Sequence, residues 1–340
     1  MSQIKMPDKH MMEACRLYVD NLIKPLHALG KLEEMAVRLA GITETIKPCR
    51  LNKAIVVIAG DTAVDKENET EGKQSLLEFH ALAKGLAPVS AVARMLDTPL
   101  YLIDAGLESD TTGIEGALVK KVIKGTHRGG MAMTREQAAE AVSLGMSVAK
   151  SLASQGVNAV ALGNIGERSL LSALGVTAAV MKDELQKNAK ENGIPIEIKE
   201  VGDLREDPVA FLGKIGSAEI AALFGLTVQA AKERMAIVFD NAVTGAAVLA
   251  AVETYPPIRE YVFPSACYDE PLHQMQMKRL KMKPFLHYDF MLAEGFGSAM
   301  GLSLLEASLD MLNVMKTFGE GGVDVAEDGP GKDRQREDVR

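Results

Sequence analysis

The sequence contains no tryptophan, and aromatic residues make up only 4% of its 340 positions. Proteins that bind single-stranded nucleic acid stack bases on aromatic side chains, and this composition offers no such surface. The formal net charge of -8 also opposes attraction to nucleic acid and to anionic membrane surfaces. We therefore expect neither a nucleic-acid partner nor a membrane partner.

Cysteine is equally scarce, with Cys15, Cys49 and Cys267 far apart in the chain. This number and spacing provide neither a disulfide framework nor a zinc site, so we expect free thiols in a reducing compartment. The 6 histidines form no His-x-x-x-His or His-Glu pair of the kind that binds metal. The sequence thus predicts no metal site and no cofactor.

Long apolar runs are missing as well. No stretch of about 18 apolar residues is present, and residues 1–20 mix acidic and basic side chains with apolar ones. Neither a membrane span nor a signal peptide is predicted, and we expect a cytoplasmic protein. With 47% hydrophobic residues, the chain is able to bury a large core.

Short apolar runs alternate with long helical patterns. Strands are predicted at 54–58, 100–103, 159–162 and 236–239, and helices at 75–96, 134–155 and 169–189. Two further helical regions, 12–41 and 299–318, flank them, and the first is interrupted at Lys24-Pro25. The alternation favours an α/β fold with a mostly parallel sheet and helices on both faces. The last segment, 321–340, is rich in glycine and charge, so we expect it to be disordered.

Among the residues that are present, Glu294 is the most informative, because it lies between an apolar segment and Gly295. Partial desolvation there would raise the pKa of its carboxyl group and make it a better proton acceptor near neutral pH. Glu294 is therefore a candidate general base. The alternative is that it caps the helix that follows, where a negative charge suits the free amides.

Two other segments are candidates for ligand binding. Gly163, Asn164 and Gly166 follow a predicted strand and precede a predicted helix, where backbone amides can hold a phosphate. An ordinary strand-to-helix turn is the alternative. Asp61 follows the first strand, and ligands gather at such strand ends in parallel sheets. Gly163 and Gly166 do not supply the Gly-x-Gly-x-x-Gly turn that dinucleotide-dependent redox enzymes use.

A set of short motifs runs through the chain in a fixed order. They are Lys24-Pro25, Leu29-Gly30-Lys31-Leu32-Glu33, Ala59-Gly60-Asp61, Gly125-Thr126, Ala132-Met133-Thr134-Arg135-Glu136, Glu219-Ile220-Ala221-Ala222, then Ser265, Glu270, His273 and the Glu294 segment. In this order and spacing, residues 20–325 resemble the nicotinate-nucleotide dimethylbenzimidazole phosphoribosyltransferase family. Members of that family move the phosphoribosyl group of nicotinate mononucleotide onto a lower-ligand base of a cobamide and release nicotinate.

The resemblance implies roles for individual residues. It assigns Glu294 as the base that deprotonates the acceptor, and it assigns substrate contacts to a set of residues comprising Asp61, Gly163, Asn164, Gly166, Lys187 and Ser265. Lys187 aligns loosely, and a surface lysine is the alternative. The resemblance also implies a small helical domain from residues 1–45 and 299–320 beside a Rossmann-like α/β domain at 46–298.

The chain departs from the family pattern mainly in its phosphate loop. Leu162, Asn164 and Glu167 stand where the family has Glu, Gly and Asn, and Ala293 replaces the first glycine of the Gly-Glu-Gly segment. A carboxylate about 4 Å from a phosphate would repel it by roughly 4 kcal/mol at an effective dielectric constant near 20. We therefore expect a damaged phosphate cradle.

These departures suggest that the chain works with a second, paralogous chain. Family members are dimers whose active sites are completed by the neighbouring subunit, and a two-subunit form that uses phenol and p-cresol is known. This chain looks like one half of that form, so the predicted activity is phosphoribosyl transfer to a phenolic base by a heterodimer. A homodimeric enzyme for benzimidazole-type bases and a catalytically silent scaffold subunit are the alternatives.

Overall fold

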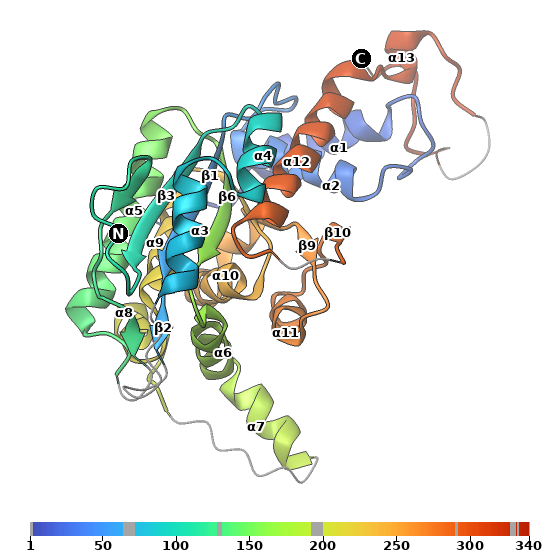
Figure 1. Cartoon of the computed structure of the whole chain (residues 1–340). Helices are drawn as coiled ribbons and strands as arrows, with labels where there is room; N and C mark the ends of the chain where they lie inside the picture. The colour runs from blue at the N-terminus through green and yellow to red at the C-terminus, as the bar shows by residue number, and fades with distance from the viewer. Residues whose placement is uncertain are drawn as a thin grey trace.

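A six-stranded parallel sheet forms the centre of the computed structural model, which describes residues 3–63, 72–127, 131–191, 200–289, 292–326, 331 and 333–339 (Figure 1). The strands follow the order β4-β3-β1-β6-β7-β8, and all neighbours are parallel. They are β1 (Lys53–Gly60), β3 (Leu100–Gly106), β4 (Ala117–Val119), β6 (Ala159–Ile165), β7 (Ala236–Phe239) and β8 (Val262–Pro264). The predicted α/β fold with a parallel sheet is confirmed.

Within the described ranges, four very short strands lie outside this sheet. β2 (Thr62–Ala63) pairs with β5 (Thr126–His127), and β9 (Ala266–Cys267) pairs with β10 (Leu286–His287). In the main sheet, every residue of β1 and β6 is buried, which requires cover on both faces. The four predicted strands are all present, whereas β4 and β8 have only three residues each and carry no readable pattern.

Helices cover the sheet and connect its strands. They are α1 (Lys9–Asp20), α2 (Lys31–Thr43), α3 (Lys73–Ala83), α4 (Pro88–Met95), α5 (Arg135–Ser154), α6 (Ser169–Val180), α7 (Lys182–Glu191), α8 (Pro208–Ile215), α9 (Ala218–Lys232), α10 (Ala242–Thr254), α11 (Pro271–Leu280), α12 (Phe296–Val314) and α13 (Phe318–Gly321), with a 3-10 helix at Pro256–Glu260. α9 packs on β1, β3, β6 and β7, α5 packs on α9, and α12 packs on β6, β7 and β8.

Two predicted helices are divided in the structure. The pattern at 75–96 becomes α3 and α4, because Gly85 takes a left-handed conformation and Pro88 begins a new helix. The pattern at 169–189 becomes α6 and α7, separated at Met181. By length and composition, 73–95 is apolar enough to cross a membrane. In the structure this segment is divided into two helices, α3 and α4, joined by a turn.

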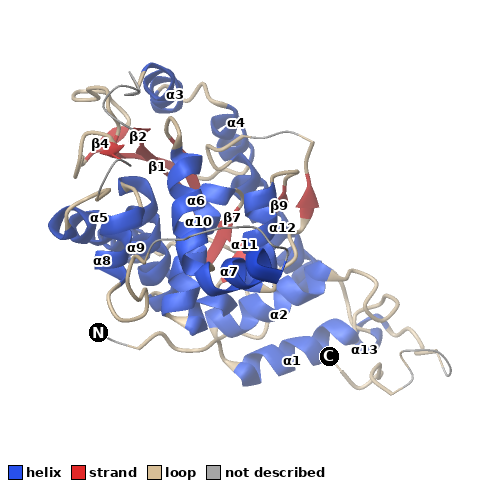
Figure 2. Cartoon of the chain, turned by 90° about the horizontal axis from the view of Figure 1, so that it is seen from below, coloured by secondary structure: helices blue, strands red, loops and turns tan. Residues whose placement is uncertain are grey.

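The N-terminal helix α1 and the C-terminal segment lie side by side near α2. Figure 2 places α1, α13 and the C-terminus together, and Leu22 pairs with Thr317 in an isolated β-bridge. Gln335 donates hydrogen bonds to the carbonyl oxygens of Asp20 and Lys24, at 3.1 and 3.0 Å. The described part of the tail therefore contacts α1. The sequence predicted a disordered segment at 321–340 and did not predict this contact. The predicted division into domains stays a prediction.

Candidate functional site

A cavity of about 270 Å³ lies at the carboxyl ends of β6 and β7. Its wall includes Asn164 and Gly166 from the end of β6, Arg168 and Ser169 from the start of α6, and Asn241 from the turn after β7. Ligands bind at this edge of parallel sheets because the loops that follow the strands gather there. Of the predicted substrate-binding residues, Asn164 and Gly166 line the cavity. A larger cavity, of about 660 Å³, lies between α5 and β3, and none of the predicted site residues lines it.

Asn241 joins three parts of the site, although sequence analysis did not select it. Its amide nitrogen donates to the side-chain oxygen of Asn164 and to the carbonyl oxygen of Ala293, both at 3.0 Å. Its amide oxygen accepts from the backbone of Val243 and Thr244 at the start of α10. An asparagine between an apolar strand and an apolar run is an N-cap signal, and that signal was readable in the sequence.

Gly163 and Gly295 let the 292–295 turn lie directly on β6. A Cβ atom on Gly163 would stand 2.6 Å from the carbonyl oxygen of Glu294 and 2.9 Å from the Cα of Gly295. Gly295 itself has a φ of +84°, in the region that favours glycine, and it is the N-cap residue of α12. Gly163 therefore has a packing role here and is absent from the wall of the cavity.

Glu294 belongs to the same turn but is absent from the wall of the cavity. Its carboxylate Oε1 accepts a hydrogen bond from the backbone N–H of Val89, at 2.8 Å. Val89 is the second residue of α4, so Glu294 caps α4, and the alternative that it caps α12 is wrong. The residue is only 9% exposed, and burial raises the pKa of its carboxyl group, whereas the hydrogen bond from the Val89 N–H lowers this pKa. A raised pKa suits a proton acceptor.

Asp61 is buried and ties loops together. Its carboxylate accepts hydrogen bonds from the backbone N–H groups of Glu108 and Glu167, both at 2.8 Å, and from the hydroxyl of Ser75 at 3.1 Å. Burial raises the pKa of Asp61, although these three hydrogen bonds lower it. The contacts hold three loops together behind the site, and Asp61 does not line the cavity.

Glu167 is absent from the wall of the cavity. Its carboxylate accepts a hydrogen bond from the backbone N–H of Gln74, the second residue of α3, at 2.9 Å. The negative charge thus lies at a helix N-terminus, where the free amides stabilise it. The predicted repulsion between Glu167 and a bound phosphate is therefore weaker than the sequence suggested.

Ser265 and Lys187 lie away from the cavity. The hydroxyl of Ser265 is fully buried and donates to the carbonyl oxygen of Phe239 at 3.1 Å. Lys187 lies on α7, which projects from the body of the molecule (Figure 1), and its ammonium group is 4.0 Å from the carboxylate of Glu191. The position of Lys187 agrees with the alternative of a surface lysine.

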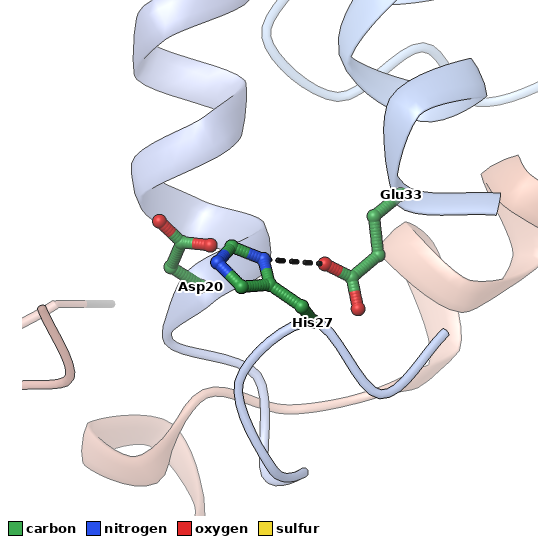
Figure 3. Close-up of side chains that lie close together, drawn as sticks. All are labelled: Asp20, His27 and Glu33. Carbon is green, nitrogen blue, oxygen red and sulfur yellow. Dashed lines mark ion pairs between the residues drawn. The ribbon is translucent and has the colours of Figure 1, made fainter. Parts of the chain in front are cut away.

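Asp20, His27 and Glu33 form a second cluster of polar groups (Figure 3). One ligand atom from each residue lies within 4.8 Å of the others. Both carboxylates already have cationic partners, because Lys24 is 2.9 Å from Glu33 and Arg334 is 3.2 Å from Asp20. A metal ion would meet these two cations, so the cluster does not fit a metal site.

The chain has extensive similarity to known proteins. A family model described as phosphoribosyltransferase matches residues 4–323. The nicotinate-nucleotide–dimethylbenzimidazole phosphoribosyltransferase of Alkaliphilus metalliredigens is 34% identical over 337 residues, covering 94% of this chain and 96% of the relative. The enzyme of the same name from Geobacter sp. strain M21 is 32% identical over 343 residues, covering 95% and 97%.

A solved structure agrees with this. The crystal structure of nicotinate-nucleotide–dimethylbenzimidazole phosphoribosyltransferase from Thermus thermophilus superimposes with a TM-score of 0.83 and 28% identity, covering 94% of this chain and 100% of that one. The predicted resemblance to this family is confirmed. The chain belongs to the nicotinate-nucleotide–dimethylbenzimidazole phosphoribosyltransferase family, and it is thereby a pentosyl-transferring enzyme.

Proposed function

We propose that this protein transfers the phosphoribosyl group of nicotinate mononucleotide to a phenolic cobamide base, as one subunit of a heterodimer. The names of its relatives include a nicotinate nucleotide and dimethylbenzimidazole. The observation that carries the proposal is the 292–295 turn, in which Leu292 and Ala293 line the cavity while the carboxylate of the next residue, Glu294, is held outside the wall by Val89. A transferase needs its donor and acceptor on two sides of one reaction point.

The donor would occupy the cavity. Arg168 lines it, and a guanidinium binds the oxygens of a phosphate or a carboxylate in a forked geometry. The N-terminus of α6 begins at Ser169 in the same wall, and its first backbone amides favour an anion. Nicotinate mononucleotide carries both a phosphate and a carboxylate, so it supplies the charges that this wall binds.

The acceptor would lie on the Glu294 side of the turn. Glu294 would take the proton of the acceptor hydroxyl, and the resulting oxygen anion would attack C1′ of the ribose with inversion. As it attacks, the bond from C1′ to the pyridinium nitrogen breaks. The electron pair of that bond stays on the ring nitrogen, so nicotinate leaves with an uncharged pyridine ring. Phenol has a pKa near that of tyrosine, about 10, so a nearby base helps greatly. The hydrogen bond from the backbone N–H of Val89 is made to Oε1 of the Glu294 carboxylate.

An exposed apolar face on α6 supports a second subunit. Leu170, Leu171 and Leu174 are 47%, 38% and 52% exposed, and Leu170 also lines the cavity. Clustered exposed leucines beside a binding site favour cover by another protein chain. A paralogous partner with an intact phosphate loop would also compensate for the departures at Leu162 and Asn164. A homodimer that uses benzimidazole-type bases, or a scaffold subunit without catalysis, remains the competing function.

The test is a transferase assay of the purified protein, alone and mixed with its nearest encoded paralogue. Nicotinate mononucleotide is the donor, and phenol, p-cresol and dimethylbenzimidazole are the acceptors. Activity that requires the mixture and prefers phenols supports the proposal. Full activity of the lone protein with dimethylbenzimidazole would overturn the heterodimer. Glu294→Gln, assayed in the mixture, distinguishes the two roles of this chain. Turnover should fall if the chain is a catalytic subunit and should be unchanged if it is a scaffold.

A further inference from the structure

Tyr268 forms part of the wall of the cavity, although it was not among the site residues predicted from the sequence. It follows β9, it is 4% exposed, and it lines the cavity. Its hydroxyl points elsewhere, because it lies within 3.5 Å of the carboxylate Oδ2 of Asp240. A Cβ atom added to Gly297 would stand 2.5 Å from that hydroxyl oxygen, so the hydroxyl is packed against the start of α12. The ring of Tyr268 therefore presents its carbon atoms to the cavity.

Asp240 is buried behind this ring. It follows β7, it is fully buried, and its Oδ2 also accepts a hydrogen bond from the backbone N–H of Ser298 at 3.2 Å. Ser298 is the third residue of α12, so the carboxylate lies at a helix N-terminus. Asp240 is not part of the cavity wall, and its contact with the site passes through Tyr268. Such a carboxylate can hold the ring in one orientation but cannot touch a ligand in this arrangement.

Two further aromatic rings restrict the movement of Tyr268. The ring of Tyr288 lies 6.0 Å away at an interplanar angle of 34°, and the ring of His273 lies 6.4 Å away at 50°. His273 is itself held, because its Nε2 lies 3.1 Å from the carbonyl oxygen of Ala266. The Tyr268 ring is thus a preorganised flat surface, which costs little entropy when a ligand packs on it.

The rest of the wall selects a ligand class. Leu170, Val243 and Leu292 are apolar, while Arg168 adds a positive charge. Among the described residues of the wall there is one carboxylate, that of Glu270, and it accepts hydrogen bonds from two backbone N–H groups at the start of α11. A flat aromatic ring that carries an anionic group fits this wall, because the ring packs on Tyr268 and the anion faces Arg168.

We infer that Tyr268 is a specificity-determining residue that binds the pyridine ring of the donor, and that Asp240 is the positioning residue that orients Tyr268. The inference rests on the proposed donor, nicotinate mononucleotide. A well-placed aromatic pair strengthens binding by roughly 2- to 13-fold, which sets the size of the expected effect.

Two ligands separate ring binding from phosphate binding in the test. Dissociation constants of nicotinate mononucleotide and of ribose 5-phosphate, which has no ring, are measured by calorimetry for the complex with its paralogue. Tyr268→Leu should weaken nicotinate mononucleotide by roughly 2- to 13-fold and leave ribose 5-phosphate unchanged. Tyr268→Phe keeps the ring and should stay within about twofold of the wild type for both ligands.

Asp240→Asn keeps the shape of the side chain but replaces the carboxyl group that holds the hydroxyl of Tyr268 with an amide. It should weaken nicotinate mononucleotide in the same direction as Tyr268→Leu, raise KM more than it lowers kcat, and change the near-ultraviolet circular dichroism of the tyrosines. Tyr101→Leu, on β3 and outside this cavity, is the matched control and should change neither affinity.

The outcomes are distinct. If the wild type does not bind nicotinate mononucleotide, the proposed function fails and the inference fails with it. If the wild type binds it and Tyr268→Leu binds equally well, or loses both ligands equally, the inference is wrong while the proposed function stands. Tyr268→Phe decides the case in which the leucine variant does not fold, because a loss of more than about tenfold there would also overturn the ring contact.

Discussion

The carboxylate of Glu294 accepts a hydrogen bond from the backbone N–H of Val89 at 2.8 Å, so the predicted base also closes the N-terminus of α4. The two residues are 205 positions apart in the chain. A base that is held in this way is oriented before any substrate arrives, and the helix amides favour its ionised form. Because of this hydrogen bond, replacing Glu294 with alanine would remove both the proposed base and the cap of α4.

Glu294→Gln separates the base role of Glu294 from its capping role. Glutamine keeps an oxygen that can accept the Val89 N–H, but it cannot take a proton from the acceptor. We expect a stability within about 0.5 kcal/mol of the wild type and a fall in kcat of roughly 10²- to 10⁴-fold. Glu294→Ala should lose the cap as well, at a cost of about 1 kcal/mol of unfolding free energy. Equal turnover of Glu294→Gln and the wild type in steady-state assays would exclude the base role.

Arg168→Asn tests the anion site. Arg168 has a φ of +57°, and asparagine tolerates this left-handed conformation, so the substitution removes the charge with little backbone strain. Loss of a charge-assisted contact should weaken nicotinate mononucleotide by roughly 10- to 150-fold. Arg135→Asn is the control, because Arg135 pairs with Asp207 on the surface. Calorimetric titration should show no change for the control, and an unchanged Arg168 variant would remove Arg168 from the donor site.

Gly163→Ala tests the contact between β6 and the 292–295 turn. The added methyl group would stand 2.6 Å from the carbonyl oxygen of Glu294, so the turn must move. We expect a loss of about 1–3 kcal/mol in unfolding free energy and a lower kcat. Gly213→Ala, where the nearest atom would be 3.3 Å away, should change stability far less. Chemical denaturation of both variants checks this, and similar losses would argue against a tight contact at Gly163.

Glu219 makes stability depend on pH. It is fully buried, and among the described residues neither carboxylate oxygen has a hydrogen-bond partner. Burial raises the pKa of Glu219 from 4.5 to about 7. Because the folded state holds the proton more tightly, the stabilisation is complete below pH 4.5 and is lost as the pH rises to about 7. The loss is on the order of 3 kcal/mol.

Urea denaturation between pH 5 and pH 8 measures this slope. Glu219→Gln cannot titrate, so its unfolding free energy should fall less over the same range. Asp240, whose pKa burial raises from 3.8 to about 7, adds a similar slope that the variant retains. Identical pH profiles for the wild type and Glu219→Gln would mean that Glu219 is ionised in the folded protein.

Leu174→Glu tests the proposed subunit contact. Leu174 is 52% exposed on α6, so a charge there should leave the fold of the single chain intact but oppose burial by a partner. Val314→Glu, at the end of α12 and 77% exposed, is the matched control. Size-exclusion chromatography of the mixed chains should show loss of the complex for Leu174→Glu alone. A complex of unchanged size and activity would place the interface elsewhere.

Much of the fold was readable because its signals are local. Runs such as Ile55–Ile58 are β-branched and apolar, and they end at a glycine or an acidic residue, so strand type and strand end were both visible. The break between α3 and α4 was also present in the sequence as Gly85 and Pro88, but the continuous apolar rhythm masked it. Asn164 and Gly166 were found because a turn after a buried strand is a local feature.

The sequence by itself determined the alternation of strands and helices, the family, and which polar residues follow the central strands. Only the tertiary structure decided what each carboxylate does. Glu294 caps α4 and Glu167 caps α3, across 205 and 93 positions of chain, and Asp240 lies behind Tyr268. These contacts depend on how helices that are distant in sequence pack at the edge of the sheet. No local pattern of residues carries that information, because a carboxylate takes whichever buried amide the packing brings to it.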